Sequence, residues 1–148
     1  MPTNSQVTQG TLNRLLTSVV IANLPTLNVT SPYMGSSFAQ LQLDQNFSEL
    51  IGTATGAVQS PQPYVMGTIT VNLLKTQGLS AQWLAQAQAS ADLGQVTAYP
   101  DSTAFPPVTL DDCVIDTIAP QAYDGKDPVV RVTIRGVYYL NANMWSAI

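Results

Sequence analysis

Apolar and polar residues alternate along much of this chain, and this pattern predicts strands. The clearest example runs from Tyr64 to Lys75, where every second side chain is apolar. A period of two places those side chains on one face of a strand, toward a core. We therefore expect a half-buried strand here. Its predicted core face carries Val65, Ile69, Val71 and Leu73, and its predicted outer face carries Thr68, Thr70 and Asn72.

A second long strand is expected at residues 129–140, with Val130, Val132 and Ile134 inward and Arg131, Thr133 and Arg135 outward. Runs of β-branched and alternating residues predict further strands. These cover residues 15–22, 27–30, 38–44, 95–99 and 108–117. Asp111 and Asp112 interrupt the alternation of the last run, which indicates a bulge or a break.

The period changes once, at residues 80–91, where Ala, Gln, Trp and Leu predict the single helix. Ser80 is a suitable N-cap, and Gly94 is a natural stop beyond the last turn. A helical period puts Leu84, Ala87 and Ala91 on one stripe with Trp83 at its edge. We expect that stripe to be buried against the outside of the sheet.

Residues 44–63 form a segment with no clear period, rich in Gly and Pro. A structureless stretch of this length inside a domain is usually functional. We expect an extended loop or hairpin, with Gly52–Gly56 as its tip. The alternative is a short amphipathic helix at 47–51 followed by a surface loop. The Gly52–Gly56 stretch lacks the Gly-Lys-Ser/Thr ending of a phosphate-binding loop.

The order of elements predicts one mainly β domain over residues 1–148, with an N-terminal arm at 1–12 and a C-terminal tail at 141–148. Because strands do not alternate with helices, a parallel sheet is not expected. We expect an antiparallel sandwich or barrel of two sheets with one flanking helix. Asp124-Gly125 is a good turn dipeptide before the last strand.

Composition excludes most catalytic classes. The chain has 148 residues, no histidine, one cysteine and 9% charged residues. It therefore cannot form a Ser-His-Asp site or an intrachain disulfide, and we expect no cofactor and no metal. The only cysteine, Cys113, is expected to be a small buried hydrophobe. We expect a structural or binding module rather than an enzyme.

Charge and hydropathy limit the kinds of partner that this chain is expected to bind. The net charge is −4, and the five basic residues do not cluster, so strong nucleic-acid binding is not expected. Sparse charge gives weak repulsion between copies, which favours self-association. The N-terminus lacks the basic and apolar regions of a signal peptide, and no apolar run is long enough to span a bilayer. We expect a cytoplasmic protein, or a particle assembled in the cytoplasm.

Three further groups of residues have both a functional and an ordinary interpretation. Asp111, Asp112 and Asp116 are the densest acidic group; they could bind a hard cation or line a channel, and a solvated acidic face is favoured. Arg131 and Arg135 could pair with carboxylates of a neighbouring copy or be ordinary surface charges. Trp145 could pack on its own core or anchor in a neighbour.

Several segments resemble bacteriophage tail tube proteins. The likeness is carried by Met66–Gln77 followed by Trp83-Leu84, by Tyr99–Thr103, by Leu110–Ile118 with Cys113, and by Val129–Leu140 with Gly136-Val137-Tyr138-Tyr139. Gly52–Pro61 is similar in position to the long loop of that family. The resemblance covers residues 15–145.

The resemblance implies a subunit of homohexameric rings that stack into a tube of the phage tail or of a contractile injection system. It implies a location in the virion tail after assembly in the host cytoplasm, with sheath, baseplate or tail terminator as further partners. DNA would pass through the tube without sequence-specific binding. The inter-ring loop would include Phe47, Leu50, Ile51, Thr53, Thr55 and Val58. Candidate channel residues are Asp44, Asp111, Asp112 and Asp116, and candidate subunit-interface residues are Arg131, Arg135 and Trp145.

Three alternatives stay open at this point. The chain could be a tube-terminating or other tail protein of the same fold. It could be a β-sandwich binding module that uses a concave cluster of Tyr64, Tyr99, Tyr123, Tyr138 and Tyr139. The least favoured alternative is an enzyme that uses the carboxylates between Asp111 and Asp116.

Overall fold

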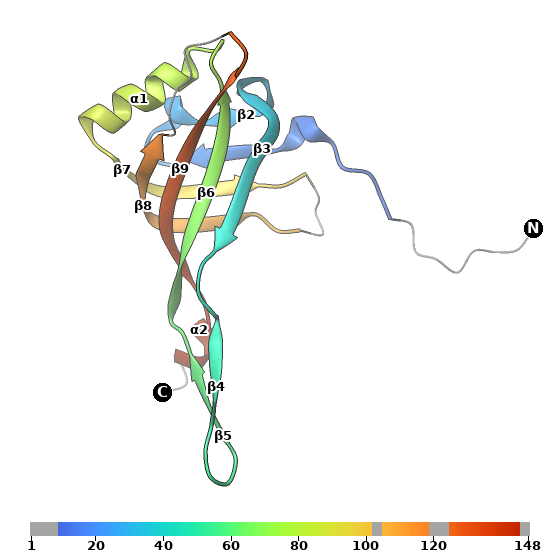
Figure 1. The fold of residues 1–148 in the computed structure, drawn as a ribbon, viewed down its shortest axis with the longest axis vertical. Helices are drawn as coiled ribbons and strands as arrows, with labels where there is room; N and C mark the ends of the chain where they lie inside the picture. The colour runs from blue at the N-terminus through green and yellow to red at the C-terminus, as the bar shows by residue number, and fades with distance from the viewer. Residues whose placement is uncertain (1–8, 102–104, 119–124, 146–148) are drawn as a thin grey trace, which may run out of the picture.

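A rolled antiparallel sheet with a long projecting hairpin makes up the molecule (Figure 1). The computed structural model describes residues 9–101, 105–118 and 125–145. The expected mainly β architecture with one flanking helix is confirmed. The strands are β1 (Ser18–Ile21), β2 (Val29–Thr30), β3 (Met34–Leu43), β4 (Ser48–Gly52), β5 (Ala57–Pro61), β6 (Tyr64–Leu74), β7 (Asp92–Tyr99), β8 (Val108–Ile118) and β9 (Val129–Tyr139). The helical segments are η1 (Arg14–Leu16), η2 (Pro25–Leu27), η3 (Ser31–Tyr33), α1 (Leu79–Ala89) and α2 (Ala142–Trp145).

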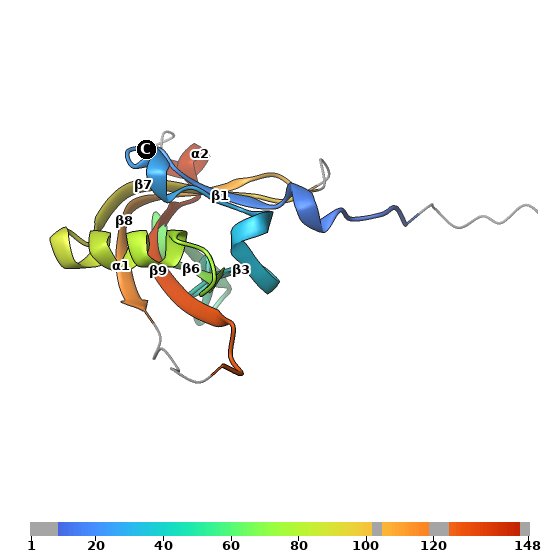
Figure 2. The same ribbon diagram turned by 90° about the horizontal axis from the view of Figure 1, so that it is seen from above.

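The main sheet has seven strands in the order β2-β1-β7-β8-β9-β6-β3, and every neighbouring pair is antiparallel. Its two outer strands, β2 and β3, are consecutive in the chain and are joined by η3. This connection brings the two ends of the sheet toward each other, so that the sheet rolls into a nearly closed barrel (Figure 2). The smaller sheet is the β4–β5 hairpin.

Apolar side chains at alternate positions of the long strands fill the barrel core. Val65, Ile69, Val71 and Leu73 of β6 are fully buried, as the sequence pattern predicts. The inward residues of β9 are buried as well, and Arg131 of the same strand is exposed. The Asp111–Asp112 irregularity is confirmed as a bulge. Asp112 has a φ of 51°, and the β8–β9 register shifts between Asp111 and Val114.

The helix covers one end of the barrel, where it contacts β6 and η2 (Figure 1). Its N-cap and its buried face differ from the prediction. The helix begins at Leu79, so Ser80 lies inside it and donates its hydroxyl to the Gln77 carbonyl rather than capping the end. The buried side chains are Leu79 and Trp83, whereas Leu84 is 37% exposed.

The buried face was misplaced because Leu79 belongs to the helix and adds to the face of Trp83. Leu79, Trp83 and Ala87 recur every four residues and share a face, which the packing selects over the stripe through Leu84. The helix ends at Ala89, followed by Ser90 in an extended conformation. Gly94 does not end the helix. It lies within β7, where its φ of 73° fits an irregularity in the β7–β8 register.

Candidate functional site

The β4–β5 hairpin projects from the barrel on the end of the β3–β6 ribbon, so residues 44–63 are a hairpin as expected (Figure 1). The alternative of a helix at 47–51 is wrong, because residues 48–52 form a strand. The tip is a four-residue turn. The Thr53 amide donates to the Gly56 carbonyl at 2.8 Å, and the Gly56 amide donates to the Thr53 hydroxyl at 3.1 Å.

Both faces of this hairpin carry exposed apolar side chains. Ile51 and Val58 are opposite each other on one face and are 49% and 55% exposed. Leu50 is on the other face and is 72% exposed. Within the described residues no third strand pairs with the hairpin. An isolated two-stranded hairpin is only marginally stable in water, so these surfaces are suited to being covered.

The base of the hairpin is fastened to the barrel by Asn141, which follows β9. Its side-chain amide donates to the carbonyl oxygens of Phe47, at 3.0 Å, and Gln62, at 2.8 Å. Asn141 has a φ of 56°, in the left-handed region that asparagine tolerates better than most residues. The Gln62 amide also donates to the Phe47 carbonyl. Sequence reasoning did not identify Asn141 as part of this region.

A polar face covers the outside of β3, β6 and β9. Directly opposed pairs place Gln42, Thr68 and Arg135 on this face, together with Gln40, Thr70, Thr133, Asn72 and Arg131. Asp44 accepts a hydrogen bond from the Arg135 guanidinium at 3.1 Å, forming a salt bridge within the chain. Arg131 Nε is 3.5 Å from Asn72 Oδ1.

The other candidate channel residues are on β8. Asp112 and Asp116 are exposed, and the register puts Asp111 opposite Val137, on the same face as Arg135. Asp111 accepts a hydrogen bond from the Gln95 side chain at 3.3 Å. Among the described residues no group of three His, Cys, Asp or Glu side chains is placed to hold a metal ion. The three aspartates therefore do not form the cation site considered above.

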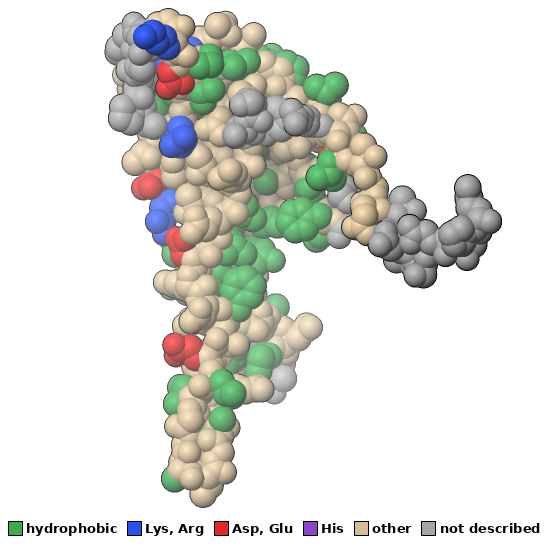
Figure 3. Space-filling view, turned by 45° about the vertical axis from the view of Figure 1, so that its right-hand side comes forward, with side chains coloured by type: hydrophobic (Ala, Val, Ile, Leu, Met, Phe, Trp, Pro, Cys, Tyr) green, Lys and Arg blue, Asp and Glu red, His purple; other side chains and the backbone are tan. Residues whose placement is uncertain are grey.

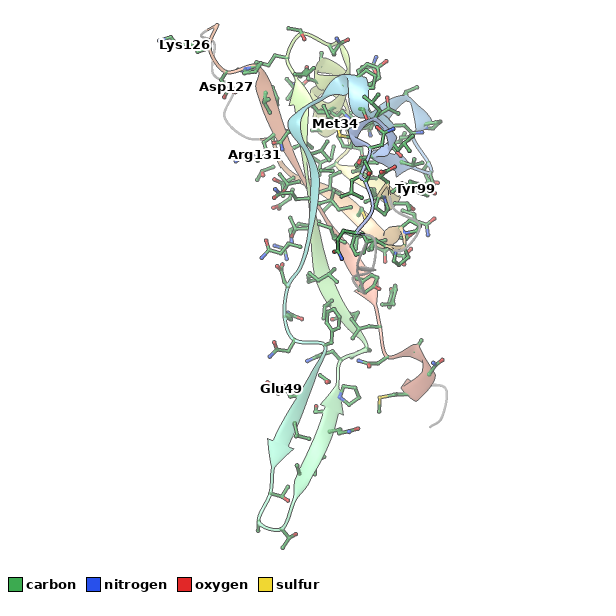
Figure 4. All side chains as sticks on the ribbon, turned by 90° about the vertical axis from the view of Figure 1, so that its right-hand side faces the viewer. Met34, Glu49, Tyr99, Lys126, Asp127 and Arg131 are labelled. Atoms are coloured by element: carbon green, nitrogen blue, oxygen red, sulfur yellow. The ribbon has the colours of Figure 1, made fainter. Side chains whose placement is uncertain are left out.

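Charged and apolar surfaces are separated on the molecule. In Figure 3 the blue and red side chains follow one edge, while green hydrophobic side chains gather on the face beside it. Figure 4 shows Lys126, Asp127 and Arg131 on the side of the barrel opposite Tyr99. On the face shown in Figure 3, the charged side chains are therefore apart from the apolar ones.

An apolar pocket of about 590 Å³ is on the Tyr99 side. It lies between β3 and the adjoining ends of β7 and β8, beside Leu12, Asn13 and Thr17. Its lining is mainly apolar and includes Leu12, Ala39, Leu41, Ala98, Phe105 and Val108. Leu12 and Phe105 at its rim are 74% and 64% exposed. The sequence analysis did not predict this pocket, because its residues come from four separate segments.

The tyrosines that a binding module could use do not gather in one place among the described residues. Tyr64 and Tyr139 are opposite each other on β6 and β9, and both are exposed. Tyr138 points to the other face of β9 and packs against the core. Tyr99 borders the apolar pocket, and Tyr123 is outside the described residues. The tyrosines that are described are therefore too dispersed for the concave site that a binding module would need.

Cys113 is fully buried, and its thiol donates to the Leu110 carbonyl at 3.2 Å. Burial raises the pKa of this thiol to about 11, and the nearby charges of Asp111 and Asp112 add to the effect. A thiol in this state is a poor nucleophile. The prediction of a small buried hydrophobe is confirmed.

Two expectations concern positions outside the described residues. The side chain of Trp145 and the Asp124 half of the predicted Asp124-Gly125 turn are outside the described residues. The same is true of the arm before residue 9 and the tail after residue 145. No helix in the described part of the chain is long and apolar enough to cross a membrane.

No family model and no curated protein matches this sequence. Among solved structures, the chain is similar to the tube-terminating cap of the anti-feeding prophage, determined by cryo-EM, with 10% sequence identity and a TM-score of 0.48. The superposition covers 93% of this chain and 97% of that one. Because the TM-score is below 0.5, we draw nothing about function from this likeness.

Proposed function

We propose that this chain is a structural subunit that assembles with copies of itself into rings, and that the rings stack into a tube of the kind found in bacteriophage tails. The β4–β5 hairpin is the observation that carries the proposal. It exposes Leu50 on one face and Ile51 and Val58 on the other. A second copy of the chain is the partner that would cover these side chains in a homo-oligomer.

The free edges of the main sheet support the same proposal. Of the strands that the structure describes, β3 pairs only with β6, which leaves its other edge open. An open edge of ten residues is an aggregation hazard unless another chain or element covers it. A strand of a second copy that pairs with β3 would satisfy that edge.

The polar face of β3, β6 and β9 is suited to the channel of such a tube. Its threonine, glutamine and asparagine side chains are compatible with water. The four candidate channel aspartates outnumber the two arginines, one of which is already paired with Asp44. A surface with surplus negative charge repels phosphate, so DNA could pass without being held. Other tail proteins would bind at the two ends of the tube.

The test is a comparison of hairpin variants. Ile51→Asn with Val58→Asn makes one hairpin face polar while leaving the barrel untouched, so the fold should persist and stacking should weaken. The matched control is Val114→Asn, an exposed valine on β8, away from the hairpin. Size-exclusion chromatography with light scattering measures the assembly. If the hairpin variant assembles as well as the control, the hairpin does not have this role.

A tube-terminating subunit is the second candidate, because the same hairpin and open sheet edge would serve a ring that ends a tube. The two functions differ in the number of rings. A tube subunit stacks repeatedly on itself, whereas a terminating subunit stops at one ring and binds a different protein. Electron microscopy of the purified chain distinguishes these two assemblies.

A further inference from the structure

The molecule has two exposed apolar features, and they are on separate parts of it. One is the β4–β5 hairpin, and the other is the apolar pocket between β3 and the ends of β7 and β8. Within one subunit the hairpin extends away from the barrel that contains the pocket (Figure 1). It is therefore directed away from its own pocket, and any contact between the two features has to join different copies.

The two features match in chemistry. The side chains near the hairpin tip are aliphatic, and the pocket lining is mainly aliphatic and aromatic. The acidic residue in the pocket lining, Asp101, is the exception to this apolar character. Asp101 accepts a hydrogen bond from the Asn13 amide, which satisfies part of its carboxylate. A volume of about 590 Å³ exceeds several-fold the roughly 150 Å³ of an apolar cavity that holds one benzene ring.

The backbone around the pocket is also suited to a strand. Ala39, Gln40 and Leu41 of β3 line the pocket, and β3 pairs with β6 on its other side. The hairpin likewise has unpaired outer edges within the described residues. A hairpin strand that adds to β3 would pair backbone groups on both chains and place alternate side chains toward the pocket.

We propose that the apolar pocket between β3 and the ends of β7 and β8 is the socket that receives the β4–β5 hairpin of a second copy. This inference rests on the proposed function, since it names the receiving surface for the hairpin contact. Hairpin and socket are different surfaces, so the contact is head-to-tail and repeats from copy to copy. Burial of the exposed apolar side chains of the hairpin and the socket would drive the association of the two copies.

Complementary variants test this contact. The hairpin variant, Ile51→Glu with Val58→Glu, keeps an intact socket. The socket variant, Leu12→Glu with Phe105→Glu, keeps an intact hairpin. The four side chains are 49–74% exposed, so both variants should fold. Circular dichroism and thermal unfolding check that the variants fold. Val114→Glu, at an exposed side chain of β8, is the matched control.

We expect each variant alone to associate about tenfold or more weakly than the control. In an equal mixture, the intact hairpin of the socket variant can enter the intact socket of the hairpin variant. Chain growth then stops, because the remaining hairpin and socket are both defective. Light scattering should therefore give a particle of twice the mass that either variant forms alone.

Other outcomes overturn the inference in distinguishable ways. If the wild-type chain does not assemble at all, both the proposed function and the socket are wrong. If the wild type assembles and only the hairpin variant is defective, the hairpin binds elsewhere and the socket alone is wrong. A mixture that gains no mass leads to the same conclusion. If deletion of residues 2–8 blocks assembly while the hairpin variant does not, the pocket receives an N-terminal arm instead.

Discussion

The guanidinium of Arg135 is 3.1 Å from the carboxylate of Asp44, at the point where β3 ends and the chain turns toward the hairpin. Both residues are on the polar face, and the pair joins β9 to the end of β3. Arg135 is a candidate subunit-interface residue, and within its own chain it pairs with Asp44. The pair neutralises one of the two arginines on the face that we propose as a channel lining.

We predict that Arg135→Gln lowers the free energy of unfolding by less than about 1 kcal/mol, since a partly exposed ion pair contributes little. The two side chains are 38% and 34% exposed, so water screens the attraction between them. A double-mutant cycle with Asp44→Asn in urea unfolding measures the coupling, which should shrink as salt is added. A large coupling unaffected by salt would contradict this account of the pair.

Trp83 and Leu84 provide a matched test of how the helix packs. Trp83 is fully buried, so Trp83→Ala should cost about 3–5 kcal/mol of unfolding free energy. Leu84→Ala should cost clearly less, because the side chain is 37% exposed. Trp83→Phe should be intermediate, since it keeps an aromatic ring. Equal losses for Trp83→Ala and Leu84→Ala in thermal unfolding would show that the helix is packed differently.

Asn141→Ala removes both side-chain hydrogen bonds at the base of the hairpin. We predict faster amide hydrogen exchange at Gln62 and across residues 48–61, with little change in β6 and β9. The expected cause is a loosened junction rather than a weaker barrel. Asn46→Ala, at an exposed asparagine close to the same junction, is the control. Uniform acceleration throughout the barrel would mean that Asn141 stabilises the whole fold.

The buried thiol of Cys113 should make the stability of the fold depend on pH in the alkaline range. This thiol has a pKa of about 11 in the folded chain against 9.0 when exposed. The unfolded chain therefore loses this proton first as pH rises, so stability should fall from pH 9 to pH 11. Cys113→Ala should flatten this part of the profile in thermal unfolding measurements. An identical slope in the variant would mean that other groups cause the decline.

The long strands could be predicted from the sequence because one of their faces is buried. Alternation at Val65, Ile69, Val71 and Leu73 reflects the pleat of β6 against the core. Composition predicted the helix, but Ser80 suggested the wrong N-terminus, so Leu79 was left out of the face that it shares with Trp83. Propensity is a weak guide when tertiary packing selects the face.

The hairpin and the pocket were harder to predict for different reasons. Leu50 and Ile51 are on opposite faces of the hairpin, so apolar residues do not alternate with polar ones there and no strand period appears. The pocket joins Leu12, Leu41 and Phe105, which are far apart in sequence. Asn141 could not be identified either, because its role depends on carbonyl groups of residues 47 and 62.

The most direct test of self-assembly is negative-stain electron microscopy of the purified wild-type chain, with its mass measured in parallel by light scattering. We predict rings with an open channel at moderate concentration, and stacked rings or tubes as concentration rises. The Ile51→Asn, Val58→Asn variant should give rings without stacks. Wild-type particles that keep the 15.8 kDa mass of a single chain at high concentration, with no rings on the grid, would contradict the account.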